Sequence, residues 1–222
     1  MSEDTPETRT QALIVPGEHG ALHGSLSLQP NAPGLVVLVH AGPPDEVETG
    51  VFTDLLRQTG LSTLNADLIA ANEEHYPDLH HNIPLLARRL LLFLGQLRHR
   101  VQMGEFPEQP IALHAGEDTT PVIVRIAAQR DHDIAALVCR GGLVDLAGVV
   151  YLRTLTSPLL LLHDAGDDHR IAANRRALRE VHCHSELRVI ADNDTRKADT
   201  ANQLAAQWMR RHLEAPAQPR PR

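Results

Sequence analysis

Aromatic residues and cysteines are both scarce in this 222-residue chain. One Trp, two Tyr and three Phe are too few for the stacking platform on which proteins bind single-stranded nucleic acid. The two cysteines, Cys139 and Cys183, are too few for a disulfide scaffold and are typical of thiols in a reducing cytosol. These shortages argue against a nucleic-acid-binding protein and against a secreted, disulfide-rich domain.

An excess of basic charge and a long apolar run are lacking as well. Lys and Arg number 21 against 28 Asp and Glu, and the net charge of −7 argues against a broad surface for nucleic acid or anionic membrane. The most apolar run, from Leu85 to Leu97, contains Arg88 and Arg89 and is too short to span a bilayer. The acidic N-terminus has no apolar signal region. We therefore expect a cytoplasmic protein with neither a nucleic-acid nor a membrane partner.

Hydrophobic residues make up 42% of the chain, which is enough to build a full core. The length suits one domain, because α/β domains of this size usually fold as a single unit. We expect a flexible N-terminus over residues 1–10, a single domain over 11–213 and a disordered, proline-rich tail over 214–222.

Short apolar runs alternate with longer helical patterns along the domain. Alternating sidedness around Pro16-Gly17 predicts an antiparallel hairpin over residues 12–28. The remaining runs are apolar on both faces, which is typical of buried parallel strands. Strands are expected at 35–39, 61–64, 111–114, 134–138, 159–162 and 186–190, and helices at 47–59, 84–100, 120–130, 171–181 and 197–213. The pattern predicts an α/β fold, a mostly parallel sheet with helices on both faces and an N-terminal antiparallel hairpin.

Five segments of the domain carry a resemblance to a known family. They are GLVVLVHAG (34–42), DLHHNIPLLARRLLLFL (78–94), ALVCRGGLVDLAG (136–148), SPLLLLHDAGDD (157–168) and AAQWMRRHL (205–213). In this order and at these spacings, the chain resembles the α/β-hydrolase superfamily, and within it the small dienelactone-hydrolase-like branch. The resemblance implies a catalytic triad in the loops that follow the carboxyl ends of the strands.

The nucleophile of that family lies in a Gly-x-Ser-x-Gly turn between a strand and a helix. Aligned without a gap, Glu117 stands in the place of the serine, and Ala115 and Thr119 stand in the places of the outer glycines. The next residue, whose N–H would help to stabilise an oxyanion, is Asp118. Its carboxylate would oppose negative charge at that place.

The resemblance also implies an acid after the strand 159–162 and a histidine after the last strand. Asp167 occupies the first place, with Asp164 and Asp168 as close alternatives. The loop after the last strand contains no histidine, and Thr195 is the best match to the missing base, within a residue or two. Without serine and histidine, ordinary acyl transfer lacks both its nucleophile and its base. The triad is therefore expected to be degenerate.

Other residues at this edge are candidates for contact with a ligand, namely His40, Gly42, Asp118, Cys139 and His169. His40-Ala41-Gly42 matches the turn that helps to form the oxyanion hole in the family. Cys139 precedes a cationic residue that would activate a thiol, although a buried structural thiol is favoured. A weaker alternative is a divalent metal, because imidazoles and carboxylates suit zinc or manganese. Its candidate ligands are His40, Glu117, Asp167 and His169.

Two functions from different classes follow. The favoured one is a non-catalytic pseudo-hydrolase without a cofactor, which binds a partner protein or a small ligand at the old site. The alternative is an atypical hydrolase of esters or lactones that uses Glu117 or a bound metal. For the assembly of the chain, a homodimer is one of the alternatives.

Overall fold

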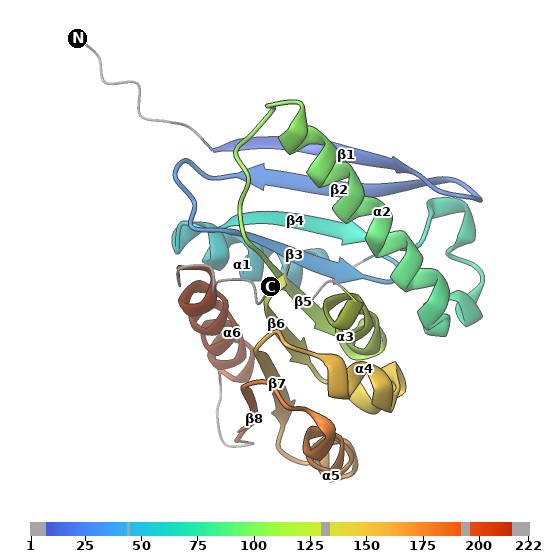
Figure 1. Cartoon of the computed structure of the whole chain (residues 1–222), viewed down its shortest axis with the longest axis vertical. Coiled ribbons are helices and arrows are strands. Elements are labelled where there is room, and N and C mark those ends of the chain that lie inside the picture. The colour runs from blue at the N-terminus through green and yellow to red at the C-terminus, as the bar shows by residue number, and fades with distance from the viewer. Residues whose placement is uncertain (1–7, 44, 130–133, 192–195, 215–222) are drawn as a thin grey trace.

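The computed structural model describes residues 8–43, 45–129, 134–191 and 196–214, which form an eight-stranded sheet with helices on both faces (Figure 1). The strand order is β1-β2-β4-β3-β5-β6-β7-β8. The strands are β1 (Arg9–Pro16), β2 (Ala21–Leu28), β3 (Leu35–His40), β4 (Ser62–Asp67), β5 (Ile111–Gly116), β6 (Ile134–Arg140), β7 (Leu159–Asp164) and β8 (Ser185–Ile190). The helices are α1 (Glu46–Gln58), α2 (Ile83–Gln102), α3 (Thr120–Gln129), α4 (Val149–Thr154), α5 (Asp168–Ala177) and α6 (Lys197–Leu213).

The pairing of the strands confirms the predicted α/β fold. β1 pairs with β2 and β2 with β4 in antiparallel register, and every pair from β4 to β8 is parallel. The parallel strands are apolar on both faces because each face is covered. Val37 and Val39 of β3 join the larger core on the side of α2 and α3, and Val36 and Leu38 join the core on the side of α1 and α6.

Several boundaries differ from the prediction at the carboxyl ends of the strands. β5, β6 and β7 run two residues beyond the apolar runs, to Gly116, Arg140 and Asp164. In each strand the first added residue is buried and the last is not, so these strands end where the chain reaches the open edge of the sheet. α5 begins at Asp168, three residues before the predicted start, and the short helix α4 was not predicted at all.

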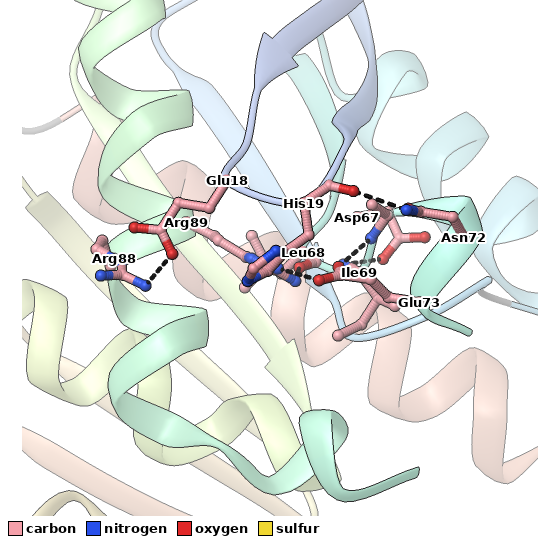
Figure 2. Close-up of polar contacts among 10 residues, drawn as sticks. Glu18, His19, Asp67, Leu68, Ile69, Asn72, Glu73, Arg88 and Arg89 are labelled. Carbon is pink, nitrogen blue, oxygen red and sulfur yellow. Dashed lines mark hydrogen bonds and ion pairs between the residues drawn. The ribbon is translucent and has the colours of Figure 1, made fainter. Parts of the chain in front are cut away.

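A buried ion pair holds the loop that follows β4 (Figure 2). Nη2 of Arg89 donates to Oε1 of Glu73 at 2.6 Å, and Nη1 donates to the carbonyl of Leu68 at 2.8 Å. The second oxygen of Glu73 accepts the N–H of Ala70 at 3.1 Å. Both charged side chains are buried, so the pair fixes the start of the loop against α2. No helix in the described part of the chain is long and apolar enough to cross a membrane.

Candidate functional site at the carboxyl edge of the sheet

The turn from β5 to α3 has the geometry of a strained elbow. A short 3-10 turn over Glu117–Thr119 joins the two elements, and Glu117 has a φ of 36°. Non-glycine residues seldom adopt this left-handed region, and those that do cluster at functional sites. Thr119 stabilises the turn, since its Oγ1 donates to the carbonyls of Gly116 at 2.8 Å and Val39 at 3.1 Å.

The loop after β6 packs directly against this elbow. Gly141 and Gly142 both have a φ of 72°. A Cβ on Gly141 would collide with the carboxylate of Glu117, and a Cβ on Gly142 would collide with the carbonyl oxygen of Glu117. Oγ1 of Thr120 donates to the carbonyl of Gly141 at 3.2 Å and ties the loop to the start of α3. Glycine is therefore required at both positions for the close approach of the two turns.

A guanidinium bridges the two carboxylates expected at the nucleophile and acid positions. Nη1 of Arg170 lies 2.7 Å from Oε2 of Glu117 and 3.5 Å from Oδ2 of Asp167. The three side chains are partly exposed, with Glu117 the most open at 58%. The two carboxylates therefore lie on either side of a permanent cation.

Behind Asp167 lies a buried histidine, His163 of β7. Oδ1 of Asn174 accepts the N–H of Val144, so its amide NH₂ group faces His163 Nε2 at 2.7 Å and the carbonyl of Gly142 at 2.9 Å. Nε2 is therefore an acceptor, and the ring proton is on Nδ1, 3.8 Å from Oδ2 of Asp167. Burial lowers the pKa of His163, against the opposing effect of Asp167, so the ring is neutral at pH 7.

Known structures share this arrangement of strands and helices. A dienelactone hydrolase from Anabaena variabilis is 26% identical in sequence and superposes with a TM-score of 0.83, which covers 94% of this chain and 100% of that one. A dienelactone hydrolase-like promiscuous phosphotriesterase from metagenomic libraries superposes with a TM-score of 0.72 at 14% identity, over 93% of this chain and 99% of that one. The chain belongs to the α/β-hydrolase superfamily, in its dienelactone-hydrolase-like branch.

Curated relatives carry a different name. Two proteins of Mycobacterium tuberculosis, from strains CDC 1551 and H37Rv, are each 27% identical to this chain over 218 residues, or 95% of its length. Both are named "Putative phosphoribosyl transferase". The chain spans about half of their length, 48%. No protein-family model matches the chain.

The turn expected to help form the oxyanion hole of an α/β-hydrolase has its donor engaged. The N–H of Gly42 donates to Oδ1 of Asp67 at 2.9 Å. Gly42 has a φ of 99°, and a Cβ there would lie 2.7 Å from the ring of His80, which in turn lies 2.6 Å from the carbonyl of Ala41. At the elbow, the carboxylate of Asp118 is exposed, 3.4 Å from the His81 ring. Gly42 and Asp118 thus lie in loops at this edge of the sheet, and their contact with a ligand stays a prediction.

Two of the ligand candidates do not reach the site. Cys139 is fully buried, and burial raises the pKa of its thiol to about 12, so the proposal that it contacts a ligand is wrong. His169 is exposed in the first turn of α5. Among the described residues no group of three His, Cys, Asp or Glu side chains is placed to hold a metal ion. The predicted metal set of His40, Glu117, Asp167 and His169 is therefore not brought together.

Thr195, the expected replacement of the triad histidine, lies outside the described residues. Sequence reasoning missed Arg170, His163 and Asn174. A signal for Arg170 was present, because it follows Asp167 by three residues and a helix that begins there places i and i+3 on one face. No comparable signal marked His163, whose partner Asn174 lies one helix further along.

Proposed function

We propose that this α/β-hydrolase-fold protein is a non-catalytic pseudo-hydrolase, which binds a small ligand or a partner protein at the carboxyl edge of its sheet. The observation that carries the proposal is the guanidinium of Arg170 between Glu117 and Asp167. In a working triad an imidazole lies between nucleophile and acid, takes the proton of the nucleophile and returns it to the leaving group.

Arginine cannot take that role. Its guanidinium stays protonated in proteins, so it accepts no proton from a nucleophile. Glu117 in turn has no hydroxyl to activate, and one of its oxygens is engaged with Arg170 at 2.7 Å. The N–H of Gly42, which was expected to help form the oxyanion hole, already donates to Asp67. This N–H is therefore engaged and does not stabilise an oxyanion, which also supports a non-catalytic protein.

The test is reaction of the full chain with a fluorophosphonate probe and with an activated acetate ester, beside an active serine hydrolase as the positive control. We expect no covalent adduct by intact mass spectrometry and no burst of alcohol release, because no serine–histidine pair is available. Stoichiometric uptake of the probe would overturn the proposal, since it would reveal an activated hydroxyl elsewhere in the chain.

A carboxylate-based hydrolase is the second candidate, and the exposure of Glu117 favours it. In that reaction the Glu117 carboxylate would attack the ester or lactone carbonyl, the C–O bond to the alcohol would break, and the alkoxide would take a proton from water. Water would then hydrolyse the mixed anhydride, which releases the acid and returns the Glu117 carboxylate. Turnover of an activated ester or a lactone that is lost in Glu117→Gln and kept in the exposed control Glu105→Gln would support it. Equal rates in both variants and the wild type would reject it.

Phosphoribosyl transfer comes to this chain only through the name of its mycobacterial relatives. The chain spans about half of those proteins, so an activity of the whole relative need not lie in the half that this chain matches. We therefore do not attribute phosphoribosyl transfer to the elbow. Pyrophosphate release from a phosphoribosyl diphosphate donor by the isolated chain would move it to first place.

A further inference from the structure

A second polar cluster lies at the carboxyl edge, on the face of the sheet that α1 and α6 cover. The register pairs Val39 with Ala115 and Gly116 with Arg140, so His40, Gly116 and Arg140 follow one another across β3, β5 and β6. Leu38, Ala112 and Val138 belong to the core on this face. The residues two positions further along each strand, His40, His114 and Arg140, therefore share the same face.

Glycine at position 116 leaves a gap in the middle of this row. A Cβ built on Gly116 would meet only the carbonyl oxygen of Arg140, at 3.7 Å. The backbone there is extended, with φ −110° and ψ 157°, so a glycine is not required by conformation. His114 precedes Gly116 by two residues on the same face, and its ring lies 4.7 Å from the ring of Phe52 of α1. We call this opening the Gly116 gap, with His114 below it and His40 and Arg140 on its two sides.

Polar groups around the Gly116 gap lack partners. Nε2 of His40 is buried and has no hydrogen-bond partner in the described part of the chain. Arg140, a partly buried residue, has no ion pair or side-chain hydrogen bond with another residue in the described part of the chain. Leaving a buried polar group unpaired is unfavourable, because the group has given up its hydrogen bonds to water.

Both imidazoles are neutral at pH 7. Burial lowers the pKa of His114 to about 3, and electrostatic repulsion from neighbouring His40, when it is protonated, and from Arg140 acts in the same direction. Burial also lowers the pKa of His40, although Asn65 and Asp67 act in the opposite direction. Arg140 is thus the permanent charge of the cluster, and a neutral His40 still offers an N–H donor.

We propose that the Gly116 gap binds the oxyanion group of a small ligand, a carboxylate or a phosphate, between Arg140 and His40. The planar fork of a guanidinium matches the paired oxygens of either group, and hydrogen bonds to an ionised acceptor are about twice as strong as neutral ones. The inference rests on the proposed function, because it specifies the ligand of the same edge. Glu117 is not part of the proposed anion site. Its carboxylate pairs with Arg170 of α5, and α5 packs with the core on the opposite face of the sheet.

The experiment follows the ring resonances of the histidines by NMR in the full chain during titration with inorganic phosphate or with acetate. Sodium chloride keeps the ionic strength constant and serves as the blank. We expect saturable shifts for His40 and His114. A lower midpoint for phosphate assigns a phosphate ligand, and a lower midpoint for acetate assigns a carboxylate.

Variants make the titration specific. Arg140→Gln should weaken binding by about tenfold or more, the effect of one charged hydrogen bond. Arg175→Gln, an exposed arginine on α5, is the matched control and should bind like the wild type. Gly116→Ala places a methyl group in the gap without backbone strain, and it should weaken binding while the melting temperature stays unchanged.

Shifts that do not saturate with either anion would overturn the inference, as would equal midpoints for Arg140→Gln and wild type. Either result leaves the pseudo-hydrolase proposal standing, because that proposal is tested by covalent labelling. Conversely, uptake of the fluorophosphonate probe would reject the pseudo-hydrolase without affecting anion binding at Arg140.

Discussion

Two opposing effects meet at the backbone of Glu117. A non-glycine residue in the left-handed region costs about 1–3 kcal/mol, whereas a partly exposed ion pair such as that with Arg170 contributes only about 0–1 kcal/mol. A glycine at position 117 would also lower the free energy of unfolding by about 0.5–1 kcal/mol, because glycine loses more conformational entropy on folding than other residues. From the central values of these ranges we expect Glu117→Gly to raise the free energy of unfolding in urea by about 1 kcal/mol. The control Arg170→Gln removes the ion pair alone and should lower it slightly. A glycine variant less stable than this control would show that the elbow is not strained.

Rebuilding a triad would require removal of Arg170 as well as addition of the missing groups. Glu117→Ser alone should not produce esterase activity, because an unassisted hydroxyl stays protonated at neutral pH. Adding Thr195→His supplies a base, and adding Arg170→Ala vacates the place between residue 117 and Asp167. Loss of triad members lowers kcat by about a millionfold, so even a crude rescue is measurable. We expect burst kinetics only in the triple variant. Equal activity in the double variant with Arg170 intact would contradict the blocking role of this guanidinium.

Sequence reasoning located Glu117 and Asp167 because each follows a recognisable apolar strand. It did not find Arg170, because the helix was expected to start at Ile171 and the preceding turn was treated as a loop. The true start at Asp168 places Arg170 in the first helical turn, where it reaches both carboxylates. Spacing alone could have indicated the pairing of Arg170 with Asp167, but only the tertiary structure brings α5 beside Glu117.

At the scale of elements, the buried Arg89–Glu73 pair connects the loop after β4 with α2 (Figure 2). Removal of one partner leaves an uncompensated buried charge, which costs about 3–5 kcal/mol. Glu73→Gln should therefore lower the free energy of unfolding by about that amount. The adjacent pair Arg88–Glu18 has a similar distance, 2.7 Å, but both side chains are 56% exposed. Glu18→Gln is the matched control and should cost about 0–1 kcal/mol. Similar losses in the two variants would contradict the role of burial.

The same pair gives a dependence on pH. Its hydrogen bond with Arg89 lowers the pKa of Glu73 below the ordinary value of 4.5. A lowered folded pKa stabilises the protein above pH 4.5, and this stability is lost as the pH falls through the folded value. The difference between wild type and Glu73→Gln should accordingly shrink in acid. The sequence showed Arg89 only as an interruption of an apolar helix, because its partner lies in a loop without periodicity.

At the scale of the whole molecule, histidines with a lowered pKa lie on both faces of the sheet. Burial lowers the pKa of four of them, namely His40, His114, His163 and His212. His163 packs on the side of α5, whereas His40 and His114 share the side of α1 and α6. The chain contains 14 histidines, and their number alone does not show which are buried. For His40, His114 and His163 the burial depends on the strand register, which decides the face of the sheet on which each ring lies.

These four rings should make the protein less stable as the pH falls from 6.5 to 5, before Glu73 titrates. In that window the unfolded chain binds protons that the folded chain refuses, so each proton of difference removes about 1.4 kcal/mol per pH unit. Urea unfolding at several pH values measures the slope. His114→Phe should reduce the slope by up to about that amount, because His114 has a folded pKa of about 3 and its ring lies against Phe52. His169→Asn is the control, since this ring is exposed and solvent surrounds it in both states. A free energy of unfolding that stays flat or rises on acidification to pH 5 would contradict the burial of these four imidazoles in the neutral form.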